Sequence, residues 1–467
     1  MKNFKIVLGL LSLGLILNCG GGSSGSNNNT NASESGTTGT VAQTTGSVTA
    51  ADGSPIAGAT VVLSQNSGAG SSLVKIANRD SFGRLIRVGE LVDDESETCD
   101  DITVSGTVIA EDCTDAEGLY SLIGDIPCGT PLTINIVRGS FSLSATITIA
   151  CSDSDGDGDF ADEITSIEPI ALSDDCGDGA DCDFDIANMA VVTGDYDEIE
   201  NVLAKLGYGS VDAYGSFDPD QPFSFTLIDG NGSLDDAAYE NFDDLLNDLD
   251  RMNEFDIIFI NCGNDFESLS TDPTVLANLQ SYVENGGKLY VTDWSYMFLE
   301  QPFPSFMDFL GGGSDASVAE TPIYEAKDGV GGIETNATVN DTTMATWLDG
   351  VRVNTGDIET DCYLLEESDV NGTLGARNAD GTVTIGDFLS AWVVMEGTHS
   401  GVTPAPTVWI EGIISHYGAS DVNAPLTVSQ DRGLGRVLYS SYHTAHSCPT
   451  QGFWPQERIL QFLVFGI

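Results

Sequence analysis

The sequence predicts a multidomain protein in which an all-β sandwich precedes an α/β domain, doubly wound around a largely parallel sheet and carrying a β-rich insertion. Two patterns lead to this prediction. From 141 to 151, apolar and polar residues alternate, which is typical of a strand with one buried face. Between 186 and 292, short apolar runs alternate with amphipathic helical stretches, the order that builds a parallel sheet covered by helices on both faces.

The length and charge of the chain narrow the classes of function. The 467 residues suffice for two or three domains. Asp and Glu number 72 and Lys and Arg only 16, which gives a net charge of −56. Binding to nucleic acid needs clustered basic residues, so we expect no nucleic-acid partner. The acidity suits divalent cations or a solvated acidic surface, and we expect most of the carboxylates to be solvated.

The N-terminus has the features of an export signal. Lys2 and Lys5 precede an apolar run from 6 to 17, which is too short for a comfortable membrane span. Cys19 follows this run directly. The segment that ends in Asn18 and Cys19 resembles the lipobox of bacterial lipoproteins, although Asn18 stands where a small residue is usual. The alternative is an ordinary cleaved signal followed by a chance cysteine.

This resemblance implies an anchored protein of the cell envelope. Residues 1–18 would be a lipoprotein signal peptide, and Cys19 would become a lipidated N-terminus that attaches the chain to a membrane. Glycines after Cys19, with no Asp beside it, favour the outer membrane, on its periplasmic or surface-exposed side. Residues 19–45 are rich in Gly, Ser, Asn and Thr, which predicts a flexible tether.

The first folded module is predicted over 46–151. The stretch 46–63 contains two alternating runs around an Asp-Gly turn, and 113–137 contains another turn followed by strands. No helical periodicity interrupts these strands, so a small antiparallel sandwich is expected. The residues "DGSPIAGATVVL" and "TDAEGLYSLIGDIPCG" resemble the carboxypeptidase regulatory-like domain, a transthyretin-like sandwich. The resemblance implies a spacer or binding module without catalytic residues.

The chain has ten cysteines, and export would allow them to oxidise. Spacing alone does not fix connectivity. The candidate pairs are Cys99–Cys113, Cys128–Cys151, Cys176–Cys182 and Cys362–Cys448. Cys262 is left over, and we expect it to be a buried structural thiol.

An acidic linker, 152–185, contains a candidate calcium site. Asp153, Asp155 and Asp157 alternate before Gly158, as in the first half of an EF-hand-type loop, where alternate carboxylates converge on one hard cation. Ile164 stands at the position of the bidentate Glu. The candidate ligands are Asp153, Asp155, Asp157, Asp159, Asp162 and Glu163. The alternative is a solvated acidic linker without calcium.

The main domain is predicted over 186–467. Strands are expected at 186–192, 256–263 and 288–294, with a helix at 272–287. This alternation predicts a flavodoxin-like, doubly wound domain. A β-rich insertion is expected over about 312–424.

The insertion is expected to add strands at 342–353, 387–397 and 405–413, each carrying one tryptophan. Trp347, Trp392 and Trp409 are expected in the core, whereas exposed tryptophans would indicate a glycan site.

The stretches "FDIIFINCGND", "LQSYVENGGKLYVTDWSYMF" and "LGRVLYSSYHTAH" resemble the class I glutamine amidotransferase-like superfamily, including its ThuA-like branch. In active members the corner after the strand holds a nucleophilic Cys, and a His-x-Glu pair activates it. Here the corner runs from Thr292 to Tyr296 without a Cys, and Ala445 stands where the acid would follow His443. The resemblance therefore implies a degenerate site.

Two functions remain open at this point. The preferred one is a non-catalytic binding or structural module with a glycan or protein ligand. The alternative is an envelope or polysaccharide hydrolase with Ser295 as nucleophile, His443 as base and Asp293 or Glu457 as the orienting acid. Two other interpretations are that His443 and His446 hydrogen-bond loop carbonyls, and that they bind a metal together with Asp293.

Overall fold

A computed structural model provides the structure of the chain. The residues described are 38–65, 102, 104, 106–153, 157, 159–172, 182–234, 238–263, 266–311, 328–354, 373–388, 391–416, 418–445 and 450–466. The predicted signal peptide, Cys19 and most of the predicted tether lie outside these residues. Within the described part of the chain, no helix combines the length and the apolar character needed to cross a membrane.

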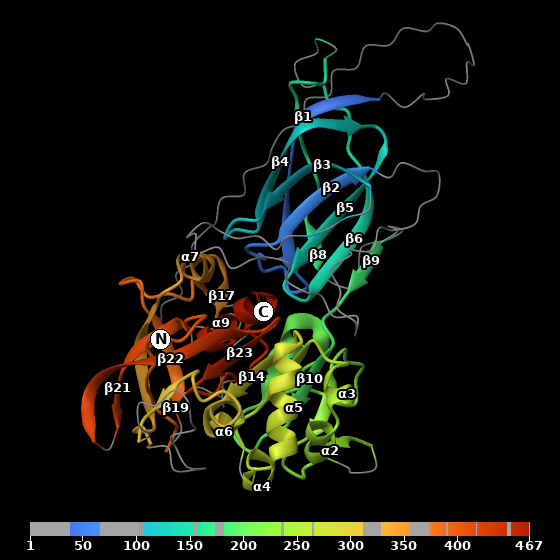
Figure 1. Cartoon of the computed structure of the whole chain (residues 1–467). Helices are drawn as coiled ribbons and strands as arrows, with labels where there is room; N and C mark the ends of the chain where they lie inside the picture. Colours follow the sequence, from blue (N-terminus) through green and yellow to red (C-terminus); the bar gives the residue numbers. More distant parts are fainter. Residues whose placement is uncertain are drawn as a thin grey trace, which may run out of the picture. The chain divides into compact units, whose positions relative to one another are not determined.

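The N-terminal strands form two sheets (Figure 1). In one, β1 (Gly39–Ala50) pairs antiparallel with β4 (Leu119–Cys128) and parallel with β7 (Ile164–Ser166) and β8 (Ile170–Leu172). The other is antiparallel, in the order β3 (Thr107–Cys113), β2 (Thr60–Gln65), β5 (Pro131–Arg138), β6 (Phe141–Thr148) and β9 (Cys182–Asp185). Alternate side chains of both sheets, such as Val48, Leu122 and Ile134, are buried in one hydrophobic cluster.

These sheets extend beyond the range predicted for the sandwich on both sides. Strand β1 begins at Gly39, inside the range predicted for the tether, because Val41 and Thr44 are buried. Strands β7, β8 and β9 lie inside the range predicted for the acidic linker. Their backbone groups find partners in β1 and β6, so 164–172 and 182–185 are parts of the sheets and not a free connection.

One predicted disulfide is confirmed. Cys128 at the end of β4 is bonded to Cys151 beyond β6, with their Cα atoms 5.1 Å apart. Cys113 is also disulfide-bonded. Cys99, Cys176, Cys362 and Cys448 lie outside the described residues, and the side chain of Cys182 is not described either.

A ten-stranded mixed sheet forms the centre of the second region. Six strands run parallel: β12 (Glu240–Asn241), β11 (Thr226–Asp229), β10 (Met189–Val192), β13 (Ile257–Ile260), β14 (Lys288–Thr292) and β23 (Gly435–Ser440). Four antiparallel strands continue the sheet: β22 (Ala419–Arg432), β21 (Thr407–His416), β16 (Ile333–Val339) and β19 (Val383–Phe388). From β11 to β23 the spatial order 2-1-3-4-5 differs from the chain order only at the first two strands.

Both faces of the parallel strands are buried. Every residue of β10, β13 and β14 is buried, and successive residues such as Ile257 and Ile258 belong to different hydrophobic clusters. Helix α5 (Pro273–Glu284) packs into one cluster through Val275 and Leu279, whereas α9 (Pro455–Gly466) packs into the other. The continuous apolar runs in the sequence follow from this two-sided burial.

Local signals set the limits of α5. The side chain of Asp272 accepts a hydrogen bond from the Thr274 amide at 2.7 Å, and Pro273 occupies the first turn. The helix ends before Asn285, and Gly286 has φ 111°, a left-handed conformation that favours glycine.

Shorter helices complete this region. They are α1 (Ile199–Leu203), the π-helix η1 (Ala204–Tyr208), α2 (Phe242–Asn247), α3 (Leu249–Met252), α4 (Glu267–Ser270), the 3-10 helix η2 (Asp293–Tyr296) and α6 (Met297–Glu300). Taken together, the chain is mostly sheet with fewer helices, distributed over several sheets, as expected for a β-rich α/β protein of several domains.

The predicted insertion contains a helix as well as strands. Its small strands are β17 (Arg352–Val353), paired with β18 (Thr373–Leu374), and β20 (Met395–Gly397), which pairs with β15 (Asp308–Phe309) just before the insertion. The prediction of a strand at 342–353 is wrong, because residues 342–350 form helix α7 (Thr342–Gly350). Asp341 caps it by accepting from the Met344 amide at 2.6 Å, and Met344, Trp347 and Leu348 are buried at helical spacing.

The tryptophans of the insertion are not exposed. Trp347 and Trp392 are buried, and their indole N–H groups donate to the carbonyls of Pro55 and Val330. Trp409 is partly buried and donates to the Ser429 hydroxyl at 2.8 Å. Trp347 and Trp392 therefore present no open stacking surface, whereas Trp409 lines a small cavity.

Candidate functional site

The candidate site lies where the parallel strands end. Ligands of open α/β sheets bind beyond the carboxyl ends of the strands, at the point where the strand order reverses. In this sheet that point lies between β10 and β13. Asp197, Cys262, Asp293 and His443 follow the ends of β10, β13, β14 and β23. The sequence thus supplies one chemically active side chain from each of four strand ends.

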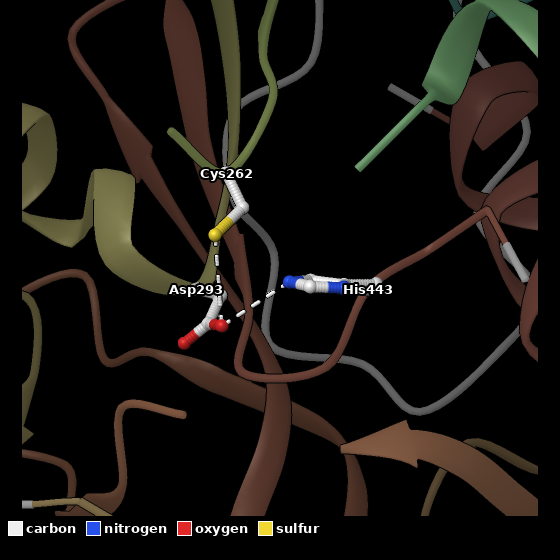
Figure 2. Close-up of side chains that lie close together, drawn as sticks. All are labelled: Cys262, Asp293 and His443. Carbon is white, nitrogen blue, oxygen red and sulfur yellow. Dashed lines mark hydrogen bonds and ion pairs between the residues drawn. The ribbon is translucent and has the colours of Figure 1, made fainter. Parts of the chain in front are cut away.

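Three of these side chains converge, as Figure 2 shows. The Nε2 atom of His443 lies 3.2 Å from Oδ2 of Asp293, and the Cys262 thiol donates to the same oxygen at 3.6 Å. Each residue offers one ligand atom, and the three atoms lie within 4.8 Å of one another. All three residues are at most 2% exposed. The cluster is therefore shielded from bulk solvent.

Asp293 occupies a strained corner between β14 and η2. Its φ of 42° is left-handed, which is uncommon for a residue other than glycine and costs about 1–3 kcal/mol. Contacts on both sides hold it there. Its Oδ1 accepts from the Val393 amide at 2.7 Å, and its backbone carbonyl accepts from the Tyr439 hydroxyl at 3.0 Å. Asp293 is thus fixed with Oδ2 directed at Cys262 and His443.

Neighbouring groups fix the other two members. The Cys262 amide donates to Oγ1 of Thr292 at 2.9 Å. The carboxylate of Asp197 accepts from the amides of Thr444 and Ala445 at 3.0 and 2.9 Å, which secures the loop that carries His443.

Burial sets the electrostatics of the cluster. It raises the pKa of Cys262 well above the usual range, and the negative charge of Asp293 raises it further, so the thiol is protonated and donates. Burial also raises the pKa of Asp197, against the opposing effects of His443 and the two amides. A reactive thiolate needs the opposite environment, with a lowered pKa.

A further acid lies beside this group. The Asn261 side-chain amide donates to Oε2 of Glu200 at 2.9 Å, and burial raises the pKa of Glu200 to about 8. The Oδ1 atom of Asn261 has no hydrogen-bond partner among the described residues, although Asn261 is fully buried. Perturbed acids of this kind gather at functional sites more often than elsewhere.

Ser295, the predicted nucleophile, is placed differently from the cluster. It is fully buried, and its hydroxyl donates to the carbonyl of Asn261 at 2.8 Å. Glu457, one of the two proposed orienting acids, is instead paired with Lys205 at 2.5 Å. His446 lies outside the described residues. The structure brings Asp293 and His443 together, as the hydrolase hypothesis requires, but engages Ser295 with the backbone.

The predicted calcium ligands are described in part. Asp155 lies outside the described residues. Asp157 accepts from the Asp159 amide at 2.7 Å, and Asp159 accepts from the Ala161 amide at 2.9 Å, so carboxylates organise the turns of the loop. Asp153, Asp157, Asp159 and Asp162 are exposed. Glu163 is buried, and its carbonyl accepts from Ala42 in β1.

A cavity of about 200 Å³ lies elsewhere on the sheet, lined by Trp409, Asp431 and Arg436 among others. Arg436 is paired with Asp431 at 2.6 Å. Small-molecule sites usually enclose about 300–1,000 Å³, so this cavity is small for such a ligand.

Sequence reasoning underestimated Cys262 and missed Asp197 and Glu200. The available signal was positional, because Cys262 and Asp197 follow the ends of buried strands, where parallel sheets gather their functional side chains. The contact of Val393 with Asp293 had no sequence signal, since it crosses from the insertion to the corner.

Comparisons with known proteins add little. No protein-family model matches the sequence, and no curated protein matches it. Among solved structures, a cytoplasmic protein from Salmonella typhimurium is similar over 60% of this chain and 98% of its own, at 11% identity and a TM-score of 0.29.

Two glycosidases are also similar over 60% of this chain. A GH42 β-galactosidase from G. stearothermophilus shows 11% identity and a TM-score of 0.27, and an exo-β-1,4-mannosidase from an Opitutaceae bacterium shows 10% and 0.22. The similar regions span 30% and 35% of those enzymes. TM-scores this low do not establish a shared fold, so none of these likenesses contributes to the assignment of a function.

Proposed function

We propose that the protein is a lipid-anchored component of the cell envelope, and that its α/β domain is a degenerate amidotransferase-like module which binds a glycan or protein ligand, or serves structurally, without catalysis. The carboxypeptidase regulatory-like sandwich acts as a spacer, and calcium stiffens the junction between the modules. The strand order 2-1-3-4-5 is the one expected of a flavodoxin-like domain and supports this assignment.

The non-catalytic proposal rests on the residues at the corner after β14 and on the contacts that they make. The amidotransferase-like resemblance places a nucleophilic Cys at this corner, and the chain has Asp293 there. Both carboxylate oxygens of Asp293 are engaged by Val393, His443 and Cys262, and the hydroxyl of Ser295 is engaged by Asn261. A nucleophile must be free to reach an electrophile, and here each candidate is buried and bonded.

A serine-directed probe tests this proposal. We expect no specific fluorophosphonate labelling of the folded full-length chain, whether wild type or Ser295→Ala. The matched control is Ser441→Ala, another fully buried serine, which lies in the loop after β23. Labelling of the wild type that persists in Ser441→Ala and disappears in Ser295→Ala would refute the non-catalytic proposal.

A hydrolase is the second candidate, and one observation favours it. Asp293 has a left-handed backbone at a strand-to-helix corner and faces His443 at 3.2 Å, and strained residues of this kind cluster at active sites. In this candidate Ser295 is the nucleophile and His443 the base. The same labelling experiment separates the two candidates, because only the hydrolase requires a reactive Ser295.

The membrane anchor is tested separately. The proposal rests on the sequence around Cys19 and predicts incorporation of a radiolabelled fatty acid into the chain and recovery with outer membranes. Cys19→Ser should abolish both. A Cys19→Ser chain that still carries the label and still sediments with membranes would show that attachment has another cause.

A further inference from the structure

The cluster of Cys262, Asp293 and His443 combines three kinds of metal-ligating atom. Thiol sulfur, carboxylate oxygen and imidazole nitrogen converge from the ends of three neighbouring parallel strands, β13, β14 and β23. The sheet supports each strand end through its ladder, which gives the three donors a rigid base. Cys262 and Asp293 follow their strands closely, and Asp197 holds the loop that carries His443, so the donors are held more precisely than on a free loop.

The two distances that Oδ2 of Asp293 makes within the cluster fit one tetrahedral ion. Zinc bonds of about 2.3 Å to sulfur and about 2.05 Å to nitrogen or oxygen, opened to a tetrahedral angle, place sulfur and oxygen about 3.6 Å apart and nitrogen and oxygen about 3.3 Å apart. Sγ of Cys262 lies 3.6 Å from Oδ2 of Asp293, and Nε2 of His443 lies 3.2 Å from it. Two of the three donor–donor distances therefore match a tetrahedral ion, and the third pair, Sγ of Cys262 and the imidazole nitrogen of His443, lies within 4.8 Å.

We propose that Cys262, Asp293 and His443 bind a divalent transition-metal ion, with Zn²⁺ as the expected occupant. A thiolate and an imidazole favour zinc and its neighbours, whereas calcium and magnesium require oxygen ligands. On binding, the Cys262 thiol releases its proton to solvent and a sulfur–metal bond forms. Asp293 and His443 contribute Oδ2 and Nε2. The three donors are at most 2% exposed. A fourth ligand of the ion would therefore be small, such as water.

Outer hydrogen bonds orient the donors, as they do in established metal sites. The Val393 amide occupies Oδ1 of Asp293 and leaves Oδ2 for the ion. The Thr292 hydroxyl holds the Cys262 amide, and Asp197 holds the loop after His443 through two amides. The left-handed backbone of Asp293 places its carboxylate where Oδ2 can bind the ion. Metal binding therefore gives a functional reason for the backbone strain at this residue.

The role of the ion would be to tie together three strand ends. The inference goes beyond the proposed ligand-binding function and does not depend on it. The acidic loop at 151–163 is a separate case, because its donors are all oxygen atoms and suit calcium.

The test uses the purified full-length chain and zinc itself. After equilibration with zinc and removal of loosely held ions on a chelating resin, elemental analysis should find about one equivalent of zinc per folded chain. Substitution with cobalt should produce a thiolate-to-metal charge-transfer absorption, which reports a bond to sulfur. Both signals should be lost in Cys262→Ser and in His443→Gln.

His399→Gln is the matched control, because His399 is also buried but lies outside the cluster. It should keep both signals. Circular dichroism verifies that each variant is folded, and the wild type alone remains decisive if a variant does not fold. A folded wild type that retains no zinc would refute the proposal, and so would zinc retained equally by Cys262→Ser and His443→Gln.

Discussion

Glu200 should make the stability of the protein fall as the pH rises. Its carboxyl group titrates at a pKa of 4.5 in the unfolded chain, and burial raises this to about 8 in the folded protein. Between these values the folded state retains a proton that the unfolded state has released. The contribution of the protonated Glu200 to the free energy of unfolding is therefore complete below pH 4.5. It is lost as the pH rises to about 8, and it does not change further above that pH.

The size of this effect follows from the shift. A change from 4.5 to about 8 corresponds, at about 1.4 kcal/mol per pKa unit, to about 5 kcal/mol at most. Glu200 is only partly buried, so solvent screening reduces the expected loss to roughly 2–3 kcal/mol. Glu200→Gln cannot ionise and retains an acceptor for the Asn261 amide, so it should lose less stability over the same range.

Urea unfolding at several pH values between 5 and 9 measures the effect. The difference in free energy of unfolding between Glu200→Gln and wild type should change by roughly 2–3 kcal/mol in favour of the variant as the pH rises. Glu267→Gln, an exposed glutamate in α4, is the control and should follow the wild type. Parallel pH profiles for Glu200→Gln and wild type would show that Glu200 does not retain a proton in the folded protein.

Three further predictions concern stability and metal binding. Lys205→Met removes the buried ion pair with Glu457, which keeps only its contact with the Trp454 amide among the described contacts, and should lower the free energy of unfolding by about 3–5 kcal/mol in urea; an unchanged midpoint would contradict the buried pair. Cys151→Ser removes the bond to Cys128 and should cost about 2–5 kcal/mol under non-reducing conditions, with an equal loss in Cys128→Ser; stability equal to wild type would refute a structural role. Calcium should raise the midpoint of thermal unfolding, and Asp157→Asn should reduce this shift; a midpoint insensitive to chelator would remove calcium from the account.

Much of the central sheet could be predicted because its strands are buried on both faces. The apolar runs at 189–192, 257–260 and 288–292 are typical of strands that are buried on both faces of a parallel sheet. The residues Asp272, Pro273 and Gly286 mark the two ends of helix α5 locally. Helix α7 was missed because its segment, with three threonines and one tryptophan, also suits a strand, and the cap at Asp341 decides between the two.

Other features depend on partners far away in the chain. Strands β7 and β9 are three and four residues long, and segments of that length acquire strand structure only through pairing with β1 and β6. The meeting of Cys262, Asp293 and His443 follows from the order of β13, β14 and β23 in the sheet, which a single sequence does not state. The engagement of Ser295 by Asn261 likewise requires β13 and β14 to be neighbours.

Turnover assays of the folded protein decide whether the site at the carboxyl ends of the parallel strands hydrolyses a substrate. Activated esters, simple amides and polysaccharide fragments are incubated with the full-length wild type and with His443→Gln. We expect both proteins to give the rate of buffer alone, because the candidate nucleophile Ser295 is buried and its hydroxyl is engaged by the carbonyl of Asn261. Hydrolysis by the wild type that is lost in a folded His443→Gln variant would contradict the non-catalytic proposal.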